Sequence, residues 1–457
     1  MKKNKLNQMS TAFFLSCIVV ALVIRPVQAD EEYHVIATLQ SPEPTSSGGF
    51  GRVIKLFEGG LIVGVYEADV DDVTSAGKAY VYDPEWDLVT LLQSPTPLEG
   101  EAFGRHIDTL GDKIAIANDR ALVDGLIEAG MVYLFYTDGS PFLELKAPFV
   151  GLYQKFGAEV TLGRDIILIA ETGGMVEGAS HGGLVHVYDD EGSYIRNLTS
   201  PSIKQEGTFG WSIAASDEYV LVGEPGYIPR SMIPKVCSVY VFDYDWNHVA
   251  TLNAPDQMER TCFGASTSIC AGHVVIGEPS ATVDGFEKAG RAHIFDTEWN
   301  HVATLQSPTP EPLAEFGGDV VVGGDIVVVG ECKGDVDSMN EGKAHVFDLD
   351  GNLIATLVSP EPAVAALFGS SVETDGEIIV VGETNVEAGG ESKAGKVHVF
   401  ELGEEPEQPD PEEPPDPEPE PDSESRRSGG IPGFPLESIA SSIVLAVIVL
   451  WLIRRQR

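Results

Sequence analysis

The sequence predicts an all-β protein whose main part is a closed, seven-bladed β-propeller of four-stranded antiparallel blades. Three observations predict this fold. They are a repeat of about 53 residues, four short strand-like segments in each copy, and an N-terminal strand that belongs to no copy of its own. Apolar runs near the two ends predict a signal peptide before the propeller and a transmembrane helix after it.

Seven Phe-Gly pairs mark the repeat, at intervals of 53, 53, 53, 54, 53 and 52 residues. Their phenylalanines are Phe50, Phe103, Phe156, Phe209, Phe263, Phe316 and Phe368. Near-constant spacing of this length indicates an array of similar supersecondary units.

The sixth copy shows the parts of one unit most clearly: FGGDVVVGGDIVVVGE, an acidic loop, then GKAHVFDLDGNLIATLVSP. Turns at Gly323-Gly324-Asp325 and Asp350-Gly351-Asn352 separate the first strand from the second and the third from the fourth. Because the apolar runs are short and rich in Val and Ile, they exclude a helical solenoid. Four antiparallel strands per copy are typical of a propeller blade.

The two ends of the repeat region predict how the ring closes. The segment HVIATLQSPEP from His34 matches the fourth strand HVATLQSPTP from His301, yet it precedes the first Phe-Gly pair. The last copy ends at KVHVFE, after its third strand. We expect the N-terminal strand to complete the last blade, which removes open sheet edges.

Residues 1–29 are predicted to be a signal peptide. Lys2, Lys3 and Lys5 precede an apolar run, and Val27-Gln28-Ala29 predicts cleavage after Ala29, with an uncleaved anchor as the alternative. Residues 30–402 then form the propeller.

Residues 403–430 are acidic and rich in proline and glutamate, which predicts an extended stalk. Within residues 431–457, the stretch from Leu436 to Ile453 is long enough to span a bilayer, and arginines follow it. Since arginines favour the cytoplasmic side, we expect a single-pass anchor that holds the propeller at the extracellular face of the cell membrane.

The chain has 29 basic and 71 acidic residues, so its charge argues against nucleic acid as a partner. Four cysteines follow the signal peptide: Cys237, Cys262, Cys270 and Cys332. They allow three pairings, and both disulfides between neighbouring blades and free thiols remain open.

The repeat resembles the FG-GAP family of integrin α-like propellers over residues 34–401. The resemblance rests on the Phe-Gly pairs, on strands ending in VYVF or AHVF, and on Gly-Glu-Pro at Gly223 and Gly277, where the family has Gly-Ala-Pro. It implies a surface protein whose second-to-third and fourth-to-first strand connections share one ligand-binding face. The family's calcium loops have no counterpart here, because only short turns such as Gly111-Asp112 join the first two strands.

The C-terminal end is similar to the sorting signal of archaeal surface proteins. Pro432, Gly433 and Phe434 precede the apolar span, as in that signal. The resemblance implies cleavage near the motif and attachment of a lipid, with retention of the helix as the alternative.

The second-to-third strand connections differ in sequence, and six are read as opening with a glutamate: Glu67, Glu171, Glu224, Glu278, Glu331 and Glu383. Because calcium prefers several carboxylates at close range, an acidic loop face is a candidate calcium site. Its candidate ligands are Glu67, Asp69, Asp71, Asp72, Glu331, Asp335 and Asp337. A solvated acidic rim is the alternative, and no other cofactor is predicted.

Other candidates have structural interpretations. One position of the third strand holds His186, His293, His345 and His398, where other copies have tyrosine, which indicates packing rather than metal binding. Trp86, Trp246 and Trp299 are interpreted as turn caps, with a carbohydrate platform as the alternative. Asn197 begins the single glycosylation sequon.

The innermost strands depart from the repeat at Arg52, Arg105, His106, Asp108, Glu159, Trp211 and Asp319. No catalytic motif is found, so the expected function is not enzymatic but that of a cell-surface binding or adhesion module for an extracellular protein or glycan. One alternative is a self-associating component of the cell envelope. A second is a surface glycosidase or lyase that holds an anionic sugar with the channel arginines.

Overall fold

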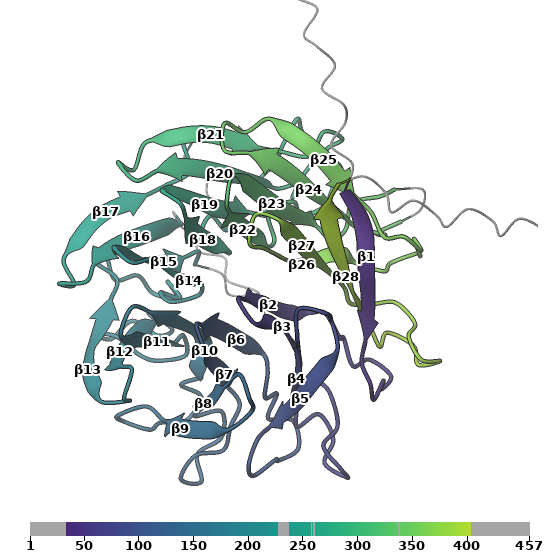
Figure 1. The fold of residues 1–457 in the computed structure, drawn as a ribbon. Helices are drawn as coiled ribbons and strands as arrows, with labels where there is room; N and C mark the ends of the chain where they lie inside the picture. Colours follow the sequence, from purple (N-terminus) through teal and green to yellow (C-terminus); the bar gives the residue numbers. More distant parts are fainter. Residues whose placement is uncertain (1–32, 227–236, 257, 259–260, 337–338, 404–457) are drawn as a thin grey trace, which may run out of the picture. The chain divides into compact units, whose positions relative to one another are not determined.

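The computed structural model describes residues 33–226, 237–256, 258, 261–336 and 339–403. Strands in these ranges form seven four-stranded antiparallel sheets, which confirms the predicted propeller (Figure 1). The predicted signal peptide, the stalk beyond Gly403, the sorting motif and the C-terminal apolar span lie outside the described residues. Within the described ranges, no helix has the length and apolar character needed to cross a membrane.

Each blade runs from an inner to an outer strand. Blade 1 contains β2 (Val53–Phe57), β3 (Gly60–Val65), β4 (Lys78–Tyr82) and β5 (Leu88–Gln93). Blade 2 contains β6 (His106–Leu110), β7 (Lys113–Asn118), β8 (Met131–Tyr136) and β9 (Pro141–Leu145). Blade 3 contains β10 (Phe156–Gly163), β11 (Ile166–Glu171), β12 (Leu184–Asp189) and β13 (Tyr194–Thr199). Blade 4 contains β14 (Ile213–Ala215), β15 (Tyr219–Glu224), β16 (Ser238–Asp243) and β17 (His248–Leu252).

The remaining blades repeat this order. Blade 5 contains β18 (Thr267–Cys270), β19 (His273–Glu278), β20 (Arg291–Asp296) and β21 (His301–Leu305). Blade 6 contains β22 (Val320–Gly323), β23 (Ile326–Glu331), β24 (Lys343–Asp348) and β25 (Leu353–Leu357). Blade 7 contains β26 (Phe368–Thr374), β27 (Ile378–Glu383), β28 (Lys396–Leu402) and β1 (Tyr33–Gln40).

Blade 7 closes the ring as predicted. β1 pairs antiparallel with β28 from Tyr33↔Leu402 to Gln40↔Lys396 and thereby serves as the outer strand of the last sheet. The first and last inner strands, β2 and β26, also contact each other. The N-terminal strand therefore joins the two ends of the repeat array and gives β28 a strand partner on both sides.

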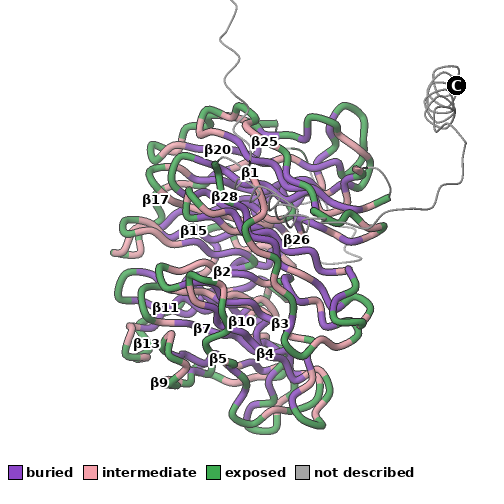
Figure 2. The backbone as a smooth tube through the Cα atoms, turned by 45° about the vertical axis from the view of Figure 1, so that its right-hand side comes forward, coloured by how far each residue is buried: buried purple, intermediate pink, exposed green. Residues whose placement is uncertain are grey.

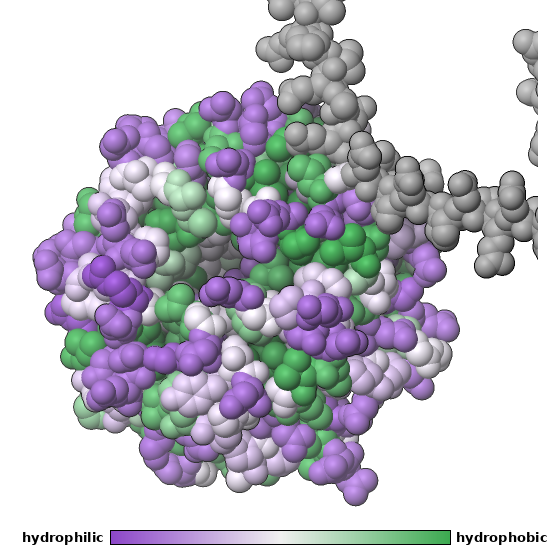
Figure 3. Space-filling view, in the orientation of Figure 1, coloured by the Kyte–Doolittle hydropathy of each residue, from purple (hydrophilic) through white to green (hydrophobic). Residues whose placement is uncertain are grey.

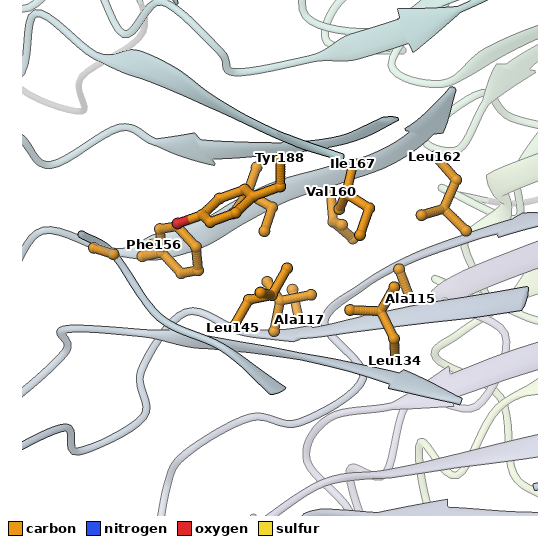
Figure 4. Packing of buried hydrophobic residues seen from close by; sticks show 12 residues of the cluster. Ala115, Ala117, Leu134, Leu145, Phe156, Val160, Leu162, Ile167 and Tyr188 are labelled. Carbon is orange, nitrogen blue, oxygen red and sulfur yellow. The ribbon is translucent and has the colours of Figure 1, made fainter. Parts of the chain in front are cut away.

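Burial follows strand position within each blade. The second and third strands are almost wholly buried, whereas outer strands such as β5 and β13 expose most of their side chains (Figure 2). Apolar side chains on both faces of the middle strands pack between neighbouring blades. One such cluster joins Ala115, Leu134 and Leu145 of blade 2 to Val160 and Ile167 of blade 3 (Figure 4).

The Phe-Gly pairs occupy the contacts between blades. All seven phenylalanines are at most 1% exposed. Each meets an aromatic ring of its own third strand edge-on, with centroids 6.0–6.4 Å apart and interplanar angles of 80–89°. Edge-to-face pairs of this kind add to the stabilisation gained from burial.

Cys237, Cys262, Cys270 and Cys332 form no disulfide with one another in the structure. The tryptophans of the predicted turns adopt positive φ angles of 67–69° and pack against core clusters, as a turn cap requires. Trp299, for example, meets Tyr219 of the neighbouring blade edge-on at 4.8 Å.

Candidate functional site

One end of the ring gathers most of the sequence differences between blades. Here the second strands lead into the third strands, and the fourth strands lead into the next Phe-Gly pair. We call this end the loop face. Figure 3 shows one face of the ring, on which hydrophilic and hydrophobic side chains are interspersed.

The second-to-third strand loops vary less in backbone than their sequences suggest. They are 11–13 residues long. Five contain a two-residue turn closed by an isolated antiparallel bridge, such as Val70↔Val73 and Val123↔Leu126. The first turn residue has φ of 48–52° at Asp71, Asp124, Glu177 and Asp284. Since Asp and Asn tolerate positive φ in such turns, most of these carboxylates have a conformational reason to be there.

The candidate calcium ligands are not gathered around one point. Glu67, Asp71 and Asp72 are exposed, while Asp69 Oδ1 accepts a hydrogen bond from the Ser75 N–H at 2.8 Å. In the sixth blade, Asp335 Oδ1 accepts from the Asn340 N–H at 2.6 Å, and Asp337 lies outside the described residues. In the part of the chain that the structure describes, no group of three or more His, Cys, Asp or Glu side chains is placed to hold a metal ion.

The structure corrects the position of the repeated glutamates. Glu171, Glu224, Glu278, Glu331 and Glu383 end their second strands and are only 0–3% exposed, so they lie beneath the loops rather than on them. In blade 1 the same register is held by Val65, which pairs with Lys78 as Glu331 pairs with Lys343. Glu67 is therefore not their equivalent, because it lies two residues further along and is exposed.

Four of these glutamates bind the repeated histidines. The Nε2–Oε2 distances are 2.8 Å for His186–Glu171, 2.9 Å for His293–Glu278, 2.6 Å for His345–Glu331 and 2.8 Å for His398–Glu383. In blade 6, Thr356 and Ser307 extend the pair at its two ends. In blade 4, Tyr240 donates to Glu224 instead. The predicted structural role of the histidines is confirmed, and its cause is the need of a buried carboxylate for partners.

An exposed apolar group lies on the loop face where blades 2 and 3 meet. Ile127, Phe149, Leu152, Tyr153 and Met175 are 52–87% exposed. Their loops touch, because the Tyr153 N–H donates to the Ile127 carbonyl and the Gly173 N–H donates to the Gln154 carbonyl. We call these five residues the apolar loop patch; single-residue patterns along the sequence did not reveal it, since they come from three separate loops.

The inner strands enclose a central channel of about 340 Å³, and most of the predicted departures line it or lie beside it. Lys55 Nζ lies 2.5 Å from Glu373 Oε1 within it. Burial raises the pKa of Glu373 to about 7 although Lys55 opposes this rise, and burial likewise raises the pKa of Asp108 and of Asp319.

Nearer the loop face, His106 Nδ1 lies 3.3 Å from Glu159 Oε2. Arg52 and Arg105 lie at the channel mouth, and both contact the Tyr66 ring. Trp211 occupies the corresponding position of blade 4 and is 37% exposed. The structure thus brings the departures of blades 1, 2 and 3 together, whereas the acidic loop residues remain apart.

Comparisons with known proteins support the fold. No protein-family model and no curated protein matches the chain. Among solved structures, the WD40 domain of Pan2 from Neurospora crassa matches with a TM-score of 0.51 at 12% identity, over 83% of this chain and 98% of that one. BamB from Moraxella catarrhalis matches with a TM-score of 0.43 at 10% identity, over 81% of this chain and 100% of that one. At such identity the Pan2 match shows a propeller and nothing about ligands.

Replacing His345 with phenylalanine is expected to destabilise the protein by about 2–4 kcal/mol, because Glu331 then remains buried without its main partner. The ring keeps its packing against Phe316. The double variant Glu331→Val with His345→Tyr copies Val65 and Tyr80 of blade 1 and should recover most of this loss, since the new hydroxyl can meet Ser307 as Tyr80 meets Ser41. Urea unfolding measures both; equal losses in the two variants contradict the role assigned to the pair.

Glu373→Gln is expected to flatten the pH dependence of stability between pH 4.5 and 7. The native protein holds this proton up to about pH 7, whereas the unfolded chain releases it near 4.5. The proton's contribution is therefore complete below pH 4.5 and is lost as the pH rises to about 7. In urea unfolding, wild type should lose on the order of 1–3 kcal/mol more than the variant over this range. The exposed Glu377→Gln is the control, and a slope unchanged in Glu373→Gln contradicts the prediction.

Proposed function

We infer that this protein is a cell-surface binding module that presents the loop face of its propeller to an extracellular protein or glycan. The observation that carries this proposal is the apolar loop patch, in which Phe149 is 87% and Met175 is 72% exposed. Contiguous exposed apolar side chains of this kind mark interaction sites on soluble domains.

The ends of the chain support a location outside the cell. The sequence around Ala29 favours a cleaved signal peptide, and the apolar span from Leu436 favours attachment to the membrane, either as a helix or through lipid added near Pro432-Gly433-Phe434. The acidic stalk would hold the propeller away from the bilayer. The seven Phe-Gly pairs support kinship with FG-GAP propellers, and Asn197 is exposed on β13, where a glycan can be accommodated.

The same patch favours one alternative, the self-associating envelope component, because a second copy of the chain can cover exposed apolar side chains as well as a different molecule can. Within the primary proposal, Asp71 and Asp72 at the tip of a loop of blade 1 are the residues best placed to make binding depend on calcium, since both are exposed.

If the loop face binds calcium, calorimetric titration of the full chain in detergent solution should give a saturable heat, and the thermal midpoint should fall when a chelator is added. The double variant Asp71→Asn with Asp72→Asn should lose both effects. Asn tolerates the positive φ of residue 71, so the fold is retained. The control is Asp112→Asn, an exposed residue in a turn at the opposite end of the ring. If wild type gives no heat and no midpoint shift, calcium does not bind here and these carboxylates form a solvated rim.

Sedimentation velocity separates the two roles of the apolar loop patch. A module that binds a different molecule should remain monomeric as the concentration of the full chain is raised in detergent solution. The envelope alternative predicts concentration-dependent association that the double variant Phe149→Ser with Met175→Ser abolishes. Because both side chains are largely exposed, this variant should keep the unfolding midpoint of wild type within a few degrees.

A further inference from the structure

Positive charge gathers at one point of a strongly acidic chain. Of the six arginines among the described residues, Arg52, Arg105 and Arg120 surround Tyr66. The guanidinium carbons of Arg52 and Arg105 lie 5.5 and 5.7 Å from the centre of the Tyr66 ring. Burial raises the pKa of the Tyr66 hydroxyl, and these arginines oppose that rise. The mouth of the channel on the loop face therefore gathers three arginines, beside the carboxylates of Glu67, Asp119 and Glu159.

These arginines retain capacity for hydrogen bonds. Arg105 Nη1 lies 3.8 Å from Asp119 Oδ1, too far for a hydrogen bond, and within the described ranges neither atom has another hydrogen-bond partner. Asp119 thus attracts one end of the Arg105 guanidinium group, while 32% of the arginine side chain stays exposed. The Arg52 side chain is exposed and contacts the Tyr66 ring.

The channel below the arginines is lined by small hydroxyl side chains. They come from the inner strands of blades 4, 5 and 7 and the residues just before them, and are Ser212, Ser266, Thr267, Ser268, Ser370 and Ser371. Five of these hydroxyls donate their protons within the protein, as Ser212 does to the Gly264 carbonyl and Ser371 to the Gly51 carbonyl. Their oxygens keep lone pairs that can accept hydrogen bonds, so this wall suits a ligand that donates from hydroxyls of its own. The cavity of about 340 Å³ is at the small end of the range for ligand sites, which favours one compact polar ring.

We propose that the channel mouth binds the carboxylate-bearing ring of an acidic sugar, a uronate. Arg52 and Arg105 hold the carboxylate, because the guanidinium fork matches its two oxygens. The serine-rich wall receives the ring hydroxyls. The proposal rests on the proposed function, ligand binding at the loop face, and names the class of ligand.

Glu67 provides an internal test of sign. Its negative charge raises the pKa of Tyr66, whereas the arginines lower it. Replacing Glu67 with glutamine should therefore strengthen the binding of an anion at the mouth. The same change should weaken any cation bound by the acidic loop of blade 1, so the two sites respond in opposite directions.

The experiment is calorimetric titration of the full chain in detergent solution with galacturonate and glucuronate, with galactose and glucose as neutral counterparts. We expect saturable binding of at least one uronate, weaker binding at high salt, and no binding of the neutral sugars. The double variant Arg52→Ala with Arg105→Ala should lower the affinity about tenfold or more. The matched control is Arg164→Ala, which removes an arginine that lies 4.9 Å from the Tyr244 ring at the opposite end of the channel.

Four results overturn the assignment: no binding of either uronate, equal affinity in wild type and the double arginine variant, sulfate bound as tightly as uronate, or an acidic dipeptide bound in place of the sugars. If uronates fail to bind while calcium still binds through Asp71 and Asp72, the uronate site is wrong and the proposed function stands. If uronates bind and calcium does not, the site stands without a cation surface.

Discussion

The close approach of backbones at each Phe-Gly pair is the constraint on which the ring depends. Gly130, just before the third strand of blade 2, has φ of 90°, and a Cβ there would lie 1.9 Å from the carbonyl oxygen of Phe156 in blade 3. The Phe156 ring is at the same time buried among side chains of both blades. A glycine on one side and an aromatic ring on the other therefore set the distance between blades. Six of the seven junctions repeat this contact, and in blade 4 Cys237 takes the position of the glycine.

This contact also determines what lies directly beneath the loop face. In five blades the second strand ends in a buried glutamate, directly before the loop. Side chains of the neighbouring third strand and of the preceding connection hydrogen-bond to it, as His345 and Ser307 do to Glu331. The loops thus rest on polar groups that already have partners. Loop side chains further out do not contribute to this support and are free to differ between blades.

The repeat period, the four strands per copy and the exchange of the N-terminal strand were all predictable, because each follows from apolar periodicity and turn residues along the chain. The burial of the glutamates was not. A carboxylate at the end of an apolar strand and beside an acidic loop has the pattern of a surface residue, and only the structure shows that Glu278 is buried and hydrogen-bonded to His293. The sequence pattern also groups Glu67 of blade 1 with these glutamates. The equivalent position in blade 1 lies two residues earlier and holds Val65. The arginines were recognised as departures, but their shared contact with Tyr66 depends on how neighbouring blades meet.

Positions at which the seven copies hold the same residue indicate what the fold requires, whereas positions at which they differ are available for function. The position of Phe50 holds phenylalanine in every copy, because any other side chain would alter the spacing of the blades. Two residues later the copies hold Arg52, Arg105, Ala158, Trp211, Ala265, Gly318 and Ser370, so the ring tolerates very different side chains there. A position that the fold leaves free accumulates whatever function requires. In a chain with 71 acidic residues, two adjacent arginines at such positions run against the overall composition. The proposed anionic ligand would account for both their charge and their place at the mouth.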